Sequence, residues 1–203
     1  ITVDEKQIYD VLLFSRIHKV NLAFPVGKNG PFCRQLMTSQ HIEGTAETVF
    51  AESESMVKKL INAGVTVLRV KIEAMANPPT MRRAMKEFMQ TEEFLKNLKY
   101  SFEFHYKVVI DDEEQQKTLE SLCNKYCVSF ASNLLSKKQD KYPLISQRVR
   151  GNYEHALDQR ETFQKMLVQN GITLLLDGTH FEAIIYDSNY SLDTGFVPDP
   201  IQL

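Results

Sequence analysis

The sequence predicts an α+β protein built by tandem duplication of a ferredoxin-like βαββαβ unit, with antiparallel sheets that carry helices on one face. Three observations lead to this fold class. Two long stretches of the chain align with each other without gaps. Several short segments alternate apolar and polar residues, as half-buried strands do. Longer segments between them carry apolar residues at helical spacing.

The internal repeat rests on two alignments with nearly equal offsets. Residues 39–68 align with 146–175 at an offset of 107, with ten identities in thirty positions. Residues 4–23 align with 112–131 at an offset of 108, and residues 72–74 match 181–183 after two extra residues in the second copy. We therefore expect four parts, namely a first repeat at 1–75, a helical linker at 76–100, a second repeat at 101–187 and a C-terminal tail at 188–203.

The second copy shows the pattern of each element. Residues 102–110 alternate as a strand does, and Asp112 can cap the helix that follows, with Leu119, Leu122 and Cys123 on one side. Another helix runs from about residue 152 to Gly171, a glycine that can take the left-handed conformation at a helix end. The remaining strands are expected at 128–132, 143–150, 172–176 and 180–187.

The first copy is expected to contain the same elements. Its pattern predicts a strand remnant, a helix at 4–17, strands at 19–24 and 34–42, a helix at 45–63 and a strand at 65–74. Only Ile1 and Thr2 match the end of the strand 102–110, so we expect the natural protein to extend upstream of Ile1. In the linker, a Met-rich helix at about 81–98 is expected to pack between the repeats.

Composition excludes several classes of protein. The formal net charge of −2 argues against general nucleic-acid binding, because that function needs a basic surface. No apolar run approaches the ~18 residues that a membrane-spanning helix requires. The three cysteines show no metal-ligand spacing and fit a reducing environment, so we expect a cytoplasmic or otherwise intracellular protein.

Charged residues gather on the strand faces that point away from the helices. Residues two apart on a strand share a face, so Phe102, Phe104 and Tyr106 should face the helices. The opposite face of this strand then carries Glu103, His105 and Lys107. Three other predicted strands carry polar or charged residues on the corresponding face, namely Arg69, Lys71 and Glu73 on the first, Ser146, Arg148 and Arg150 on the second, and His180 and Glu182 on the third.

Three interpretations of these faces remain open. They can be solvated, with cross-strand charge pairs worth ~0.2–1 kcal/mol each. They can face each other and bind an anionic small molecule, with a divalent cation such as Mg²⁺ held by carboxylates. They can also belong to an interaction module that presents a sheet face or edge to a partner protein. The candidate ligand-binding residues are Arg69, Lys71, His105, Lys107, Arg148 and Arg150, and the candidate metal ligands are Glu73, Glu103 and Glu182.

The pattern Glu103-x-His105-x-Lys107, followed by Arg148-x-Arg150 and the late-strand Glu182, resembles the CYTH family of triphosphate tunnel enzymes. In that family a Glu-x-Glu-x-Lys strand, an Arg-x-Arg strand and later acidic strands coordinate metal and triphosphate inside a tunnel. The resemblance covers a few strands of the second half, and His105 stands where the family has its second glutamate.

We therefore predict binding or processing of a phosphorylated or nucleotide-like anionic ligand on the charged sheet faces. The alternative is a non-catalytic protein-interaction or regulatory module built from a duplicated ferredoxin-like domain. The sequence names no catalytic residue, and whether the protein is an enzyme stays open.

Overall fold

The computed structural model describes residues 1–27, 34–75, 101–135, 143–151, 153–175 and 179–193 of the chain. The first half contains β1 (Thr2–Val3), the 3₁₀ turn η1 (Glu5–Gln7), α1 (Ile8–His18), β2 (Asn21–Ala23), β3 (Pro25–Gly27), β4 (Leu36–Ser39), α2 (Ala46–Asn62), β5 (Val67–Arg69) and β6 (Lys71–Met75). The second half contains β7 (Ser101–Val109), α5 (Glu113–Lys125), β8 (Ser129–Asn133), β9 (Leu144–Arg150), α6 (Tyr153–Gln169), β10 (Thr173–Leu174), β11 (His180–Asp187) and η3 (Tyr190–Asp193).

The helix boundaries follow from local side-chain and backbone chemistry. The side chain of Asp112 accepts a hydrogen bond from the Gln115 amide at 2.8 Å and caps α5, as predicted. Thr45 caps α2 in the same way through the Thr48 amide. Gly64 and Gly171 follow α2 and α6 with φ of +78° and +74°, a conformation that favours glycine after a helix.

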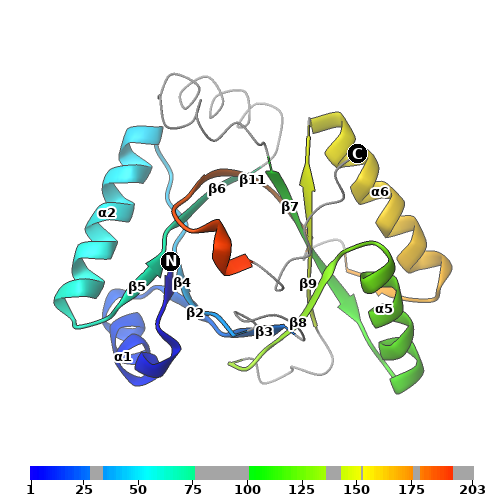
Figure 1. Ribbon diagram of the computed structural model, residues 1–203, viewed down its shortest axis with the longest axis horizontal. Coiled ribbons are helices and arrows are strands. Elements are labelled where there is room, and N and C mark those ends of the chain that lie inside the picture. The colour runs from blue at the N-terminus through cyan, green and yellow to red at the C-terminus, as the bar shows by residue number, and fades with distance from the viewer. Residues whose placement is uncertain (28–33, 76–100, 136–142, 152, 176–178, 194–203) are drawn as a thin grey trace.

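The strands form two antiparallel sheets that are joined at both ends. One sheet has the order β2-β4-β1-β5, and the other has the order β3-β8-β9-β7-β11-β6, with β10 also paired to β7. A single residue, Phe24, separates β2 from β3, and a single residue, Val70, separates β5 from β6. The chain therefore passes from one sheet to the other at two corners, and the strands together enclose an interior (Figure 1).

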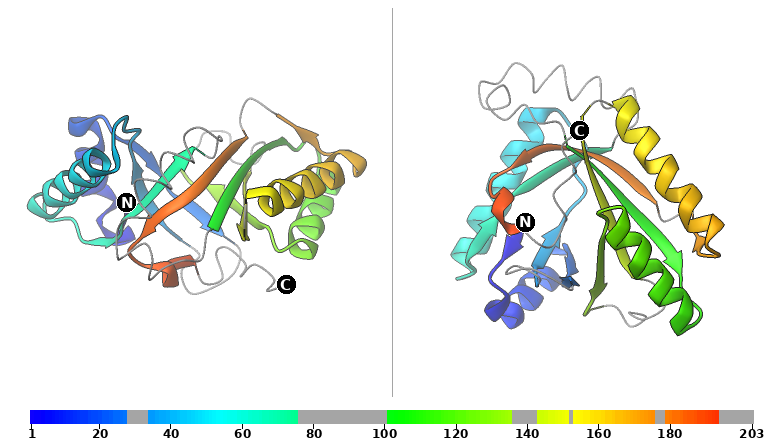
Figure 2. Two further views of the ribbon diagram at one scale, coloured as in Figure 1. Left: turned by 90° about the horizontal axis from the view of Figure 1, so that it is seen from above. Right: turned by 45° about the vertical axis from the view of Figure 1, so that its right-hand side comes forward.

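The helices lie on the outside of this arrangement. Figure 2 shows α1 and α2 at one end of the molecule, α5 and α6 at the other end, and the strands between them. Each helix pair covers its own hydrophobic core. One core contains Phe104, Tyr106 and Phe163, and the other contains Val11, Leu36 and further buried residues of α1, α2 and the first sheet. The predicted α+β class with antiparallel sheets is confirmed.

Two strand pairings join residues that differ by the offsets of the internal alignments. Pro25 of β3 lies opposite Asn133 of β8, and these two residues differ by the offset of 108. Ala74 of β6 lies opposite Ala183 of β11, and these differ by 109, the offset that aligns residues 72–74 with 181–183.

Some predicted elements are wrong in detail. The predicted strand at 65–74 is divided at Val70 into β5 and β6, which belong to different sheets. Residues 25–27, which lie between the predicted strands 19–24 and 34–42, form the further strand β3. The predicted tail begins with the ordered turn η3, in which Leu192 is buried. The predicted helix at 81–98 and the rest of the tail lie outside the described residues. Within the described ranges, no helix has the length and apolar character needed to cross a membrane.

Candidate functional site

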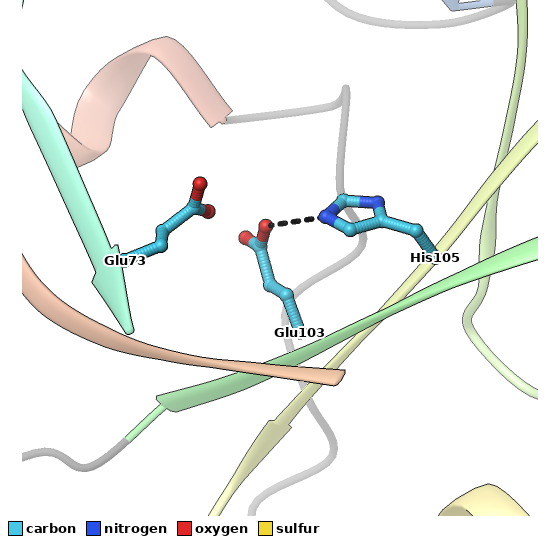
Figure 3. Close-up of side chains that lie close together, drawn as sticks. All are labelled: Glu73, Glu103 and His105. Atoms are coloured by element: carbon cyan, nitrogen blue, oxygen red, sulfur yellow. Dashed lines mark ion pairs between the residues drawn. The ribbon is translucent and has the colours of Figure 1, made fainter. Parts of the chain in front are cut away.

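The charged side chains predicted on the helix-free faces meet inside the ring of strands. Phe102, Phe104 and Tyr106 of β7 are buried in the core beneath α5 and α6, so Glu103 and His105 point the opposite way, into the interior. Figure 3 shows these two side chains converging with Glu73 of β6. We call the following group the interior charged cluster: Arg69, Lys71, Glu73, Glu103, His105, Arg148, Glu182 and Asp187.

Glu103 is the centre of the interior charged cluster. Its residue is only 3% exposed, and strand pairing places it opposite Arg148 of β9 and Glu182 of β11. Arg148 donates from Nε to Glu103 Oε1 at 2.7 Å and also contacts the same oxygen through Nη2. Lys71 donates from Nζ to Glu103 Oε2 at 2.6 Å and forms a second ion pair with Glu73. The Lys71 ammonium therefore links the two carboxylates.

His105 connects Glu103 to the neighbouring strands. Its Nε2 lies 3.3 Å from Oε2 of Glu182 and 3.7 Å from Oε2 of Glu103. Its Nδ1 lies 2.8 Å from the hydroxyl of Ser146, which is opposite His105 in the β7–β9 pairing. The imidazole thus contacts two carboxylates on one side and a hydroxyl on the other.

A second buried ion pair lies beside this group. Arg69 donates from Nε to Asp187 Oδ1 at 2.8 Å and contacts Oδ2 through Nη2, a bidentate arrangement in which the two side chains are only 4% and 0% exposed. Asp187 Oδ1 also accepts from the Asn189 amide at 2.9 Å. The Gln35 side chain, just before β4, donates to the Leu192 carbonyl at 2.7 Å, so a buried hydrogen bond joins the segment after β11 to the first half of the chain.

Two predicted ligand-binding residues lie away from the cluster. Lys107 is exposed and follows His105 on β7, about 7 Å further along the strand. Arg150 is half-buried at the end of β9, opposite Ser101. The contacts of Glu103 described above come instead from Lys71, His105 and Arg148.

The pKa values in the cluster show which charges the surroundings stabilise. Burial alone would raise the pKa of Glu103, but Lys71 and Arg148 hold it well below its usual range. Burial alone would lower the pKa of Lys71, but Glu103 and Glu73 raise it overall. The two carboxylate partners of Lys71 thus differ in the direction of their pKa shifts. The pKa of Glu103 is lowered, whereas burial raises the pKa of Glu73 in spite of the adjacent ammonium.

The imidazole of His105 and the carboxylate of Glu182 support each other's charged forms. Burial alone would lower the pKa of His105, but its hydrogen bond with Glu182 and the charge of Glu103 raise it. Burial alone would raise the pKa of Glu182, but the bond with His105 lowers it overall. The protonated imidazole is therefore favoured more than that of an ordinary histidine.

Part of the cluster has the donor atoms of a metal site. Among the described residues, one group of potential ligands stands out, because single ligand atoms of Glu73, Glu103 and His105 all lie within 4.8 Å of one another. The prediction from sequence was Glu73, Glu103 and Glu182. In the structure His105 takes the third position, and Glu182 is its partner. Two carboxylates and an imidazole fit Mn²⁺ at least as well as the predicted Mg²⁺, which prefers oxygen ligands only.

Sequence reasoning missed Asp187. Alternation along β11 from Glu182 would place residue 186 in the interior and residue 187 under the helices. The register shifts between Ile184 and Tyr186, so Tyr186 pairs with Ile72 and Asp187 pairs with Lys71. This bulge turns Asp187 inward. No signal in the sequence locates a bulge of this kind.

Comparisons with protein-family models, curated proteins and solved structures found no match to this chain.

Proposed function

We propose that the interior charged cluster binds a small phosphorylated or otherwise anionic molecule together with a divalent cation. The observation that carries this proposal is the enclosure of charge around Glu103, whose side chain is 4% exposed beside Arg148 at 7%. Removing an ion from water costs several kcal/mol, and apolar residues of similar volume are often at least as stable in such positions. Charge concentrated in an interior therefore favours a functional use over a purely structural one.

The balance of charge defines the class of ligand. The cluster contains the cations Arg69, Lys71, His105 and Arg148 and the anions Glu73, Glu103, Glu182 and Asp187, so four positive groups match four negative groups when His105 is protonated. A bare polyanion would meet repulsion from the carboxylates as well as attraction from the cations. An anion that arrives with a divalent cation presents both signs and matches the cluster better.

The roles within the site follow from residue chemistry. Arg148 and Lys71 would contact the oxyanion, since guanidinium and ammonium groups donate to phosphate oxygens. Glu73, Glu103 and His105 would hold the cation, whose chemistry there is to neutralise the ligand's charge. Because Lys71 already bridges Glu73 and Glu103, its ammonium would have to turn toward the anion when the cation binds.

We also infer that the two halves are copies of one ferredoxin-like unit, with domains at 1–75 and 101–187. The strand orders β2-β4-β1-β5 and β8-β9-β7-β10 support this, since β10 pairs with β7 as β5 pairs with β1. The pairings of Pro25 with Asn133 and of Ala74 with Ala183 support it further, because strands related by a twofold axis pair residues on that axis with their own equivalents. A charged interior between two such units is also what the resemblance to the triphosphate tunnel family implies.

A ligand titration tests the proposed binding. Inorganic triphosphate and a nucleoside triphosphate, each with and without Mg²⁺ or Mn²⁺, are added while the melting temperature is followed. At a ligand concentration 100 times Kd, the gain of about 2.7 kcal/mol corresponds to a rise of about 5–11 °C for a chain of this size. The rise should need the cation, and its absence across the whole panel would refute the proposal.

Paired substitutions locate the site without changing net charge. The double variant Glu103→Gln/Arg148→Gln removes one charge of each sign from the interior and should abolish the ligand-induced rise. The double variant Glu113→Gln/Lys117→Gln does the same to an exposed pair on α5, 81% and 73% exposed, and should keep the rise. If the interior variant does not fold, Lys71→Gln/Glu73→Gln replaces it, because these side chains are 17% and 28% exposed. An undiminished rise in the interior variant would place binding elsewhere.

A second candidate function is a non-catalytic protein-interaction module, favoured by an exposed apolar stripe on α1. Tyr9, Leu13 and Ile17 lie four residues apart on one helix face and are 82%, 61% and 65% exposed. The equivalent positions of α5 carry Lys117, Ser121 and Lys125, so a helix in this place does not need apolar residues there. A photo-crosslinker at position 13 should then capture a protein that the same crosslinker at position 121 does not capture.

A further inference from the structure

Lys71 lies where a cation held between two carboxylates would lie. Its Nζ donates to Oε2 of Glu103 at 2.6 Å and forms a second ion pair with Oε1 of Glu73. Figure 3 shows these two carboxylates converging, and with His105 they supply the three ligand atoms that lie within 4.8 Å of one another. A divalent cation would sit about 2.0–2.6 Å from its oxygen ligands. The ammonium and a bound cation therefore compete for one place.

Lys71 is also the cation of the cluster that can move with the least disturbance. Arg148 contacts Oε1 of Glu103 through two nitrogens, and Arg69 contacts Asp187 through two nitrogens. Both arginine side chains are almost fully enclosed, whereas that of Lys71 is 17% exposed. A lysine ammonium is a point charge on a flexible stem, so it can turn to another acceptor while its backbone stays in β6.

The charges of the cluster make a cation and an anion depend on each other. A cation that displaced Lys71 alone would leave an enclosed ammonium beside Arg148 and Arg69, whose positive charges already act on it. An anion that drew Lys71 away alone would leave the carboxylates of Glu73 and Glu103 close together without it. When both arrive, the ammonium pairs with the anion, the cation replaces it between the carboxylates, and the charges stay balanced.

We propose that Lys71 is an internal counter-ion that holds the place of the divalent cation until an anionic ligand binds. The anion draws the ammonium away, and the cation then enters between the carboxylates. Such coupling is reciprocal, so each ligand strengthens binding of the other by the same factor, typically about 5–150-fold. The inference rests on the proposed function, because it concerns regulation of the same site, and it adds that the protein discriminates against the free cation.

The affinity for Mn²⁺ alone tests this role. Binding is followed by electron paramagnetic resonance, in which the signal of free Mn²⁺ decreases as the ion binds. Lys71→Met removes the ammonium and keeps a long unbranched side chain. This variant should bind one Mn²⁺ per chain with a Kd lower than that of the wild type by about tenfold or more. Lys165→Met on α6 removes the same charge from a side chain that is 72% exposed and should leave the Kd unchanged.

A second substitution locates the ion. Lys71→Met/Glu73→Gln removes a proposed ligand as well as the ammonium, so its affinity for Mn²⁺ should return to that of the wild type or fall below it. If Lys71→Met does not fold by itself, Mn²⁺ should restore its circular dichroism spectrum, because the ion binds only the folded chain. A purely structural role of Lys71 predicts instead a destabilised variant that Mn²⁺ neither binds more tightly nor restores.

Equal Mn²⁺ affinities of the wild type and Lys71→Met would overturn the inference. So would tighter binding that persists in Lys71→Met/Glu73→Gln, or an unfolded Lys71→Met that Mn²⁺ does not restore. The proposed function is judged separately, by the triphosphate titration of the wild-type protein. A cation-dependent rise in that titration, together with equal Mn²⁺ affinities, would retain the proposed function and exclude the counter-ion role of Lys71. No response in either experiment would refute both.

Discussion

Replacing Glu103 with glutamine should destabilise the protein strongly, because Glu103 is the carboxylate on which the buried cations converge. Arg148 and Lys71 contact its two oxygens, and the Glu103 and Arg148 side chains are 4% and 7% exposed. An opposite charge at about 4 Å is worth about 4 kcal/mol at an effective dielectric constant of about 20. Removing one partner of a buried pair typically costs about 3–5 kcal/mol, because the other charge remains buried without compensation.

Urea unfolding followed by circular dichroism measures this loss. For a chain of this length, about 3–5 kcal/mol corresponds to a fall in melting temperature of about 6–20 °C. The double variant Glu103→Gln/Arg148→Gln should lose less than the sum of the two single variants, with a coupling energy of at least about 1 kcal/mol, since the two side chains contact each other.

The matched control is Glu113→Gln on α5. Glu113 pairs with Lys117 four residues away, but both side chains are more than 70% exposed, so the loss should be about 0.3–0.5 kcal/mol. If Glu103→Gln costs no more than Glu113→Gln, the charges around Glu103 are solvated. The argument for an enclosed site would then be wrong.

Three further predictions address other parts of the molecule. The folded protein raises the pKa of His105 above its ordinary value of 6.5, so the stabilisation by His105 is complete below pH 6.5 and is lost as the pH rises through the raised pKa. The unfolding free energy of the wild type should therefore exceed that of His105→Gln by more at pH 6 than at pH 9. An equal difference at the two pH values would contradict this. Phe163→Ala should lower the unfolding free energy by about 3–5 kcal/mol, whereas Met56→Ala at the equivalent half-buried position should lower it by less than half of that. Equal losses in urea unfolding would show that α2 is covered as well as α6. Leu13→Ser on the exposed face of α1 should change the unfolding free energy by no more than about 0.5 kcal/mol, and a larger loss would mean that this face is packed.

Local patterns in the sequence predicted most elements of the structure. Alternation along residues 102–108 identified the helix-facing residues of β7, because side chains two apart on a strand must share a face. The Asp112 cap and Gly171 marked helix ends, because capping and left-handed backbone conformations depend on a few adjacent residues. The helix α5 ends at Lys125, and Cys127 adopts a φ of +52° beyond it.

The candidate site could be predicted only in part. Alternation placed Glu103, His105 and Arg148 on one face of adjacent strands, and the structure brings them into contact. The same rule included Lys107 and Arg150, which lie further along their strands, because alternation determines the face of a residue and not its distance from a centre. It excluded Asp187, because one bulge in β11 reverses the alternation after Ile184.

The sequence by itself determined most of the helices and strands and the separation of apolar from charged faces, since both depend on neighbouring residues. Only the tertiary structure decided that the charged faces point inward. The chain turns at Val70 and Phe24 from one sheet to the other, and Arg69 then meets Asp187, a residue 118 positions away. Such contacts depend on the register between distant strands, which the order of residues along any one strand does not contain.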